Sequence, residues 1–132
     1  MPRRAVFINI LFVVSLIVWT VGLLMPVPKR STEVLGSDTA KFILSKILHG
    51  TAYAYLAVLV GLMNLSVRQR WAMLGLLSGH AFLTEFLQLF VNRGASWRDV
   101  ALDHFGISVG IAAGWSRWRV LFRQPDSSKV ET

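Results

Sequence analysis

The sequence predicts an all-α fold, an antiparallel bundle of four transmembrane helices. Hydrophobic residues make up 54% of the 132-residue chain, and its mean hydropathy of +0.53 exceeds what a soluble domain of this size needs. Four apolar segments follow one another along the chain, separated by polar or helix-breaking residues. Ionisable side chains fall within these segments, where hydrocarbon makes them costly, so each indicates a site.

The first apolar segment, residues 5–25, contains no charged residue. At about 1.5 Å per residue it is long enough to cross a hydrocarbon core of about 30 Å. Pro26 and Pro28 cannot continue the helix and should end it. After a polar connection, the second helix should start at the capping residues Ser37 or Asp38 and run to residue 66.

The third helix is expected over residues 71–91, and the fourth over residues 97–118. The turn 92–95 should separate them, because Gly94 accepts the left-handed backbone that other residues resist. Residues 124–132 are polar and predict a tail. The chain therefore divides into one membrane domain, 1–123, and this tail.

Charge and cysteine content exclude some classes of function. The net charge of +7 would suggest a nucleic-acid partner in a soluble protein, but here the basic residues flank the apolar segments and form no basic face. We therefore expect no nucleic-acid partner. The absence of cysteine excludes disulfides and thiol catalysis.

Glycines recur at four-residue intervals in two of the predicted helices. They are Gly106, Gly110 and Gly114 in the fourth helix and Gly75 and Gly79 in the third. Small residues at this spacing allow helices to approach closely in lipid. They predict close packing within the bundle, with homo-oligomerisation through these faces as the alternative.

The polar residues of the last three helices share one face of each helix, at about 100° per residue. They are Lys46, His49 and Tyr53 in the second helix, Glu85, Gln88 and Asn92 in the third, and Asp99 and Asp103 in the fourth. An antiparallel series brings the start of the second helix, the end of the third and the start of the fourth to the same side of the membrane. These residues should therefore meet in one polar pocket.

The positive-inside rule gives the orientation. The side with the termini and the second loop holds Arg3, Arg4, Arg68, Arg70, Arg117, Arg119, Arg123 and Lys129. The opposite side holds Lys29, Arg30, Lys41, Lys46, Arg93 and Arg98. The excess predicts a multi-pass protein of the cell (inner) membrane with both termini in the cytoplasm and an outward-facing pocket.

The combined spacing of these residues resembles that of the VanZ-like membrane proteins over residues 46–110. The matching motifs are Lys46-Ile47-Leu48-His49 with Tyr53, then Glu85-Phe86-Leu87-Gln88, then Arg93, Ser96 and Asp99, then Gly106 and Gly110. The resemblance implies a small bacterial membrane protein from a family whose founding member is associated with teicoplanin resistance. The chain departs from the family at Asp103, where Asn is common.

The first functional hypothesis is recognition of an anionic lipid of the cell envelope, such as a phospholipid or a lipid-linked wall precursor. Lys46 and Arg93 would bind the anion, and Glu85, Asp99 and Asp103 would orient it. The candidate ligand-binding residues are Lys46, Tyr53, Gln88, Arg93, Ser96 and Asp99.

The second hypothesis is an intramembrane enzyme acting on such a lipid, with Glu85, His49 and Asp103 as catalytic residues. A third is a structural partner of another membrane protein.

Simpler roles compete with these. Glu85 could form a structural ion pair with Lys46 or Arg93. Ser96-Trp97-Arg98-Asp99 fits a capping box, and we favour that role for Asp99.

No metal or other cofactor is expected. His80 and His104 lie about 140° from Glu85 and Asp99 on their helices, so only His49 should face the pocket. A zinc site of His49, Glu85 and Asp103 remains an alternative without a supporting ligand spacing such as His-Glu-x-x-His.

Overall fold

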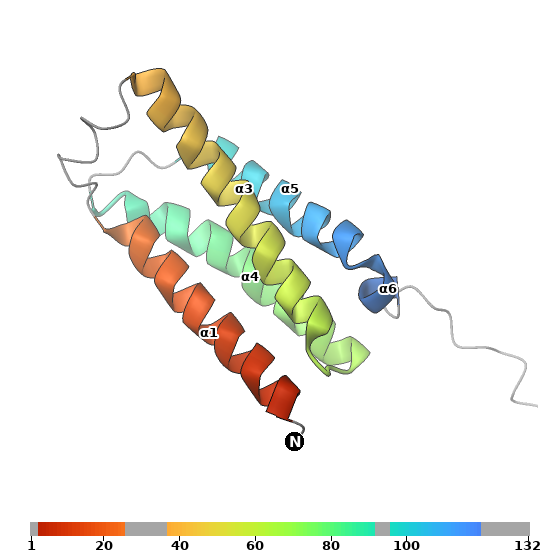
Figure 1. The fold of residues 1–132 in the computed structure, drawn as a ribbon. Coiled ribbons are helices and arrows are strands. Elements are labelled where there is room, and N and C mark those ends of the chain that lie inside the picture. The colour runs from red at the N-terminus through yellow and green to blue at the C-terminus, as the bar shows by residue number, and fades with distance from the viewer. Residues whose placement is uncertain (1–2, 26–36, 92–95, 120–132) are drawn as a thin grey trace, which may run out of the picture.

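The computed structural model of the chain describes residues 3–25, 37–91 and 96–119, and these residues fold entirely into helices and short connections (Figure 1). The helices are α1 (Arg3–Leu24), α3 (Asp38–Leu62), α4 (Val67–Gln88), α5 (Trp97–Ala113) and the short α6 (Trp115–Trp118). The predicted all-α class is confirmed. The connection after Met25, the turn 92–95 with Gly94 and Arg93, and the tail 124–132 lie outside the described residues.

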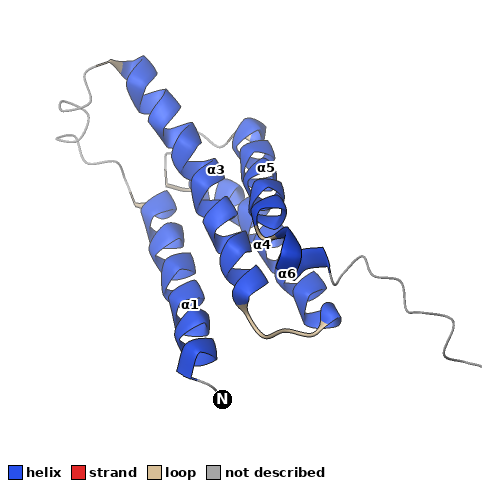
Figure 2. Cartoon of the chain, turned by 45° about the vertical axis from the view of Figure 1, so that its right-hand side comes forward, coloured by secondary structure: helices blue, strands red, loops and turns tan. Residues whose placement is uncertain are grey.

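The long helices form a bundle in which α3 packs against α1, α4 and α5, most extensively against α5. The connection from α3 to α4 lies at the same end of the bundle as the start of α1 (Figure 2). The start of α3, the end of α4 and the start of α5 therefore lie together at the opposite end. This is the placement that the antiparallel series predicted.

The boundary between the second and third helices differs from the prediction. α3 ends at Leu62, α4 begins at Val67, and residues 63–66 connect them. Ser66 caps α4 through a capping box with Gln69, in which the Ser66 backbone N–H donates to Gln69 Oε1 at 2.9 Å. This reciprocal pair satisfies donors at the helix start and lets α4 begin four residues earlier than expected.

The predicted fourth helix is interrupted at Gly114, so α5 ends at Ala113 and α6 adds a single turn. This turn carries Trp118 into the core, where it is fully buried. A Cβ atom at Gly61 would lie 2.8 Å from Trp118 Nε1, and one at Gly114 would lie 3.2 Å from Trp118 Cδ1. The indole thus packs against two residues that lack side chains.

The close approach of α3 and α5 confirms the packing predicted for the glycines of the fourth helix. A Cβ atom at Gly106 would collide with the carbonyl oxygen of Gly50, and one at Gly110 with that of Ala54 and, at 2.7 Å, with the Ala57 methyl group. Only residues without a side chain fit at these two positions.

The prediction for the third helix was wrong within this chain. A Cβ atom at Gly75 or Gly79 would meet nothing within 4 Å. These glycines therefore do not mediate packing between the described helices.

The apolar core lies away from the end of the bundle where α3 and α5 begin and α4 ends. It contains Ile8, Phe12, Tyr53, Leu56, Ala57, Leu59, Val60, Met63, Leu77, Ala81, Ile107 and Trp118. Large apolar side chains also cover the outside, including Phe7 and Val18, each 64% exposed on α1. Among the described residues, two helices, α1 and residues 39–62 of α3, are long and apolar enough to cross a membrane.

Candidate functional site

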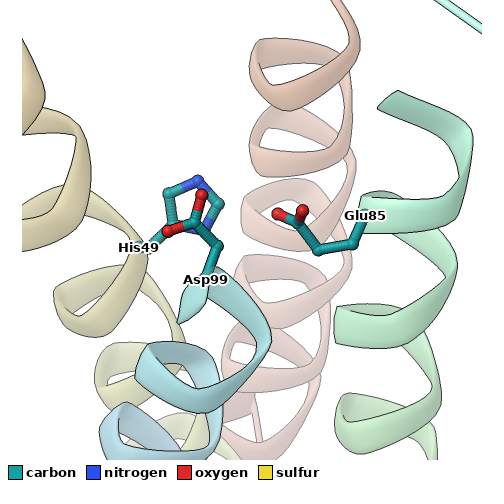
Figure 3. Close-up of side chains that lie close together, drawn as sticks. All are labelled: His49, Glu85 and Asp99. Atoms are coloured by element: carbon teal, nitrogen blue, oxygen red, sulfur yellow. The ribbon is translucent and has the colours of Figure 1, made fainter. Parts of the chain in front are cut away.

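Three helices bring a histidine and two carboxylates together at the polar end of the bundle (Figure 3). His49 comes from α3, Glu85 from α4 and Asp99 from α5, and one donor atom of each lies within 4.8 Å of the others. Each residue is 5% exposed. We call these three residues, with their neighbours Lys46 and Asp103, the polar cluster.

Lys46 is the most accessible member of the polar cluster. Its ammonium group pairs with Asp99 Oδ1, and its side chain is 20% exposed against 7% for that of Asp99. It also lies 4.9 Å from the centroid of the Phe42 ring. We expected Lys46 to interact with Glu85 directly or through one neighbour. Asp99 is the ion-pair partner of Lys46, and a carboxylate oxygen of Asp99 lies within 4.8 Å of one of Glu85.

His49 and Asp103 form a second pair. His49 Nδ1 and Asp103 Oδ1 share a hydrogen bond of 3.0 Å, and Asp103 is fully buried. The edge of the Trp19 ring packs against the imidazole, with 5.5 Å between centroids. Asp103 Oδ2 has no hydrogen-bond partner in the described part of the chain.

Glu85 caps the start of α5. Its Oε2 accepts a hydrogen bond from the Ser96 backbone N–H at 2.7 Å, while Ser96 Oγ accepts one from the Arg98 backbone N–H at 3.3 Å. In a capping box the Ser96 backbone N–H would instead donate to the side chain of Asp99. The favoured role of Asp99 was therefore wrong, since Glu85 takes that place and leaves Asp99 to pair with Lys46.

The remaining predicted site residues are Gln88, Tyr53 and Arg93. Gln88 is buried at the same end of α4 as Glu85. Tyr53 is buried too, but its hydroxyl shares a hydrogen bond of 2.8 Å with His80 Nδ1, whose Nε2 is 2.8 Å from Thr20 Oγ1. Arg93 lies outside the described residues.

The hydrogen bonds that link Thr20, His80 and Tyr53 were not predicted from the sequence. Helical periodicity correctly placed His80 away from Glu85 on α4, but the spacing of residues along one helix does not determine which neighbouring helices pack against its other face. The available signal was Thr20, one of few polar residues in the first apolar segment, but its hydroxyl also donates to the Leu16 carbonyl at 2.7 Å, so the sequence did not require a partner on another helix.

Arg70 also differs from its expected role at the membrane flank. It is buried and donates to the backbone carbonyl groups of Val60, Gly61 and Met63 at 3.1–3.4 Å. These carbonyls lie at the end of α3, where no following N–H group of the helix is available to donate to them. Arg70 is therefore a capping residue at the end of the bundle opposite the polar cluster.

Two apolar pockets flank the polar cluster. One, of about 520 Å³, is the α3–α5 groove, defined by Lys46, Ile47, Gly50, Ala54, Leu102 and Phe105. The other, of about 230 Å³, is the α4–α5 pocket, defined by Phe82, Glu85, Phe86, Ser96, Trp97 and Val100. Each has one charged residue in its described lining, Lys46 in the groove and Glu85 in the pocket.

This arrangement combines several kinds of chemistry. Three carboxylates face one ammonium group, so with a neutral imidazole and ionised carboxylates the cluster carries excess negative charge. Glu85 Oε1 has no hydrogen-bond partner among the described residues and could take up or release a proton. The same oxygen, with His49 and Asp99, could also bind a cation.

The chain was compared with protein-family models, with curated proteins and with solved structures, and no match was found in any of the three comparisons.

Proposed function

We propose that this protein is a VanZ-like integral membrane protein that binds an anionic lipid of the cell envelope in the α3–α5 groove. The observation that carries the proposal is the position of Lys46, a partly exposed ammonium group at the edge of an apolar groove. An anionic headgroup would bind Lys46 beside Asp99, and an acyl or prenyl chain would lie along Gly50 and Phe105. Such a division between charged and apolar contacts is what an amphiphile requires.

The membrane setting is supported by the outer surface of the bundle. Exposed apolar side chains occur on all four long helices, among them Phe7, Val18, Phe42, Ile47, Leu83, Phe86, Phe105 and Val109. α4 has 22 residues, which corresponds to about 33 Å of helix and matches a hydrocarbon core of about 30 Å. We propose that the four long helices all cross the cell membrane.

The orientation follows from the Lys and Arg distribution, which favours cytoplasmic termini and an outward-facing polar cluster. A reporter fused after Thr132 that works only in the cytoplasm should be active, and one that works only outside it should be silent. The opposite result would place the polar cluster on the inner side.

Lipid binding is tested by native mass spectrometry of the full chain in mild detergent, with phosphatidylglycerol and phosphatidylcholine as probes. The anionic lipid should bind more tightly, and Lys46→Met should remove this preference. Lys41→Met is the matched control, because it removes the same charge from the same helix outside the groove. Equal binding of the two lipids, or equal loss in the two variants, would contradict the proposal.

A second candidate function is an intramembrane enzyme acting on a lipid-linked or phosphate-containing envelope substrate. It is favoured by the buried pair of His49 and Asp103 close to the unpartnered Oε1 of Glu85, since a histidine held by a carboxylate can serve as general base. Release of phosphate from a polyprenyl diphosphate provides the assay. An enzyme should lose turnover but keep lipid binding in Glu85→Gln, whereas a pure binding protein should show no turnover.

The resemblance to the VanZ-like proteins also links the proposal to glycopeptide resistance. Expression of the chain in a susceptible bacterium should raise the minimum inhibitory concentration of teicoplanin, and Glu85→Gln should abolish the increase. If susceptibility to teicoplanin is unchanged while the intact protein is present in the membrane, this chain has no role in teicoplanin resistance.

A further inference from the structure

We infer that His49, Glu85 and Asp99 form a binding site for a divalent transition-metal ion such as Zn²⁺ or Mn²⁺. The inference goes beyond lipid binding and does not rest on it. A donor atom of each residue lies within 4.8 Å of the other two, and the three residues come from three different helices (Figure 3). One imidazole with two carboxylates is a donor set that suits Zn²⁺ and Mn²⁺ and leaves positions open for water or a ligand.

The hydrogen bond between His49 and Asp103 prepares the imidazole for a metal. When Asp103 is ionised, its Oδ1 can only accept, so Nδ1 donates across the 3.0 Å contact and the lone pair of the neutral ring resides on Nε2. A carboxylate behind a ligating histidine fixes the tautomer and makes the nitrogen more basic. The Trp19 ring also packs against the imidazole in a T-shaped contact.

Glu85 provides an independent indication of a ligand. It is 5% exposed, and the Ser96 backbone N–H bonds its Oε2, while Oε1 has no partner among the described residues. A buried carboxylate oxygen without a partner is costly, and a bound cation would satisfy it. The carboxylate points toward His49 and Asp99 in Figure 3.

The charge of the polar cluster and its access to the surface agree with this assignment. The polar cluster holds three carboxyl groups, those of Glu85, Asp99 and Asp103, and one ammonium group, that of Lys46, so a divalent ion would offset the negative charge of the ionised carboxylates. Glu85 also lines the α4–α5 pocket, which offers a route to the site. These features distinguish the cluster from an acidic surface patch, whose oxygens water already satisfies.

The test uses the purified full chain in mild detergent, stripped with a chelator and then titrated with Zn²⁺ alone, with Mn²⁺ in a parallel titration. Elemental analysis after gel filtration should find about one ion per chain. His49→Gln and Glu85→Gln should each weaken binding by about tenfold or more, because each removes a ligand. His104→Gln is the matched control, since His104 bonds Ser78 and the Val100 carbonyl outside the cluster.

Lys46→Met provides a variant with the opposite expectation. Removing the ammonium group frees Asp99 for the metal, so affinity should stay the same or rise, although the same variant should lose its preference for phosphatidylglycerol. Metal binding and lipid binding can thus fail separately. The inference is overturned if the intact protein binds neither ion, if His49→Gln and His104→Gln bind Zn²⁺ alike, or if Lys46→Met abolishes binding.

Discussion

Glu85 near the end of α4 accepts a hydrogen bond from the backbone of Ser96 at the start of α5, with 2.7 Å between Oε2 and the nitrogen. A side chain from one helix thus caps the next, across a separation of eleven residues. This contact ties the geometry of the polar cluster to the start of α5. It also leaves Asp99, the first-turn acidic residue of that helix, to pair with Lys46.

The capping contact predicts a difference between two substitutions of Glu85. Glu85→Gln keeps an oxygen that accepts the Ser96 hydrogen bond, whereas Glu85→Ala leaves the N–H without it. We expect Glu85→Ala to lower the free energy of unfolding by about 1–2 kcal/mol more than Glu85→Gln. Reversible unfolding in mixed micelles measures both values, and equal destabilisation would mean that the cap contributes nothing.

Lys46 and Asp99 should be energetically coupled. Loss of either partner leaves a charge in a largely buried setting, so Lys46→Met and Asp99→Asn should each destabilise the protein, and the double variant should lose less than their sum. We expect a coupling energy of about 1–3 kcal/mol from the double-mutant cycle. Lys46→Met with Glu85→Gln is the control cycle, and its coupling should be smaller because Asp99 intervenes. A larger coupling energy between Lys46 and Glu85 than between Lys46 and Asp99 would indicate that Glu85 is the partner of Lys46.

Gly110 should not tolerate a large side chain. Gly110→Leu forces a clash with the Ala54 carbonyl and the Ala57 methyl group, and α3 and α5 should separate in detergent. Crosslinking between the two helices and gel filtration provide the measurement.

The same substitution at Gly79 is the matched control, because nothing lies within 4 Å of that position. Gly79→Leu should leave the fold intact or stabilise it slightly through helix propensity. Ile111 would be a poor control, since it packs against the core. If Gly79→Leu keeps the fold but changes the oligomeric state, the open glycines of α4 mediate self-association.

Asp103 separates the requirement for an acceptor from the requirement for charge. Asp103→Asn keeps an oxygen facing His49 Nδ1, so we expect it to retain most lipid binding and stability. Asp103→Leu leaves the buried His49 Nδ1 without its partner and should lower the free energy of unfolding by about 1–3 kcal/mol. Glu85→Gln should abolish function by comparison. Equal damage from Asp103→Asn and Glu85→Gln would show that the Asp103 carboxylate itself is essential.

The sequence predicted the positions of the cluster well. Helical periodicity placed Lys46 and His49 on one face, and alternation of the helices placed them at the same end as Glu85 and Asp103. Both inferences need only spacing and direction. They were confirmed by the bonds between His49 and Asp103 and between Lys46 and Asp99.

The pairing inside the cluster could not be predicted in the same way. Glu85 and Asp99 compete for the same donor, the Ser96 backbone N–H, and the outcome depends on how α4 and α5 are shifted along their axes. Periodicity does not fix that shift. For the same reason Arg70, near the start of a helix, was interpreted as a membrane flank, although the free carbonyls at the end of α3 lay within its reach.

The contact of Gly106 with the Gly50 carbonyl has a mechanical consequence. Two backbones in direct contact slide or tilt little against each other, so α3 and α5 behave as a rigid pair that carries His49, Lys46, Asp99 and Asp103. Glu85 is the one member of the polar cluster on α4, which packs less extensively on α5 than α3 does. Displacement of α4 would open the cluster to a ligand, and the hydrogen bond between Ser96 N–H and Glu85 Oε2 is the bond that this movement would break.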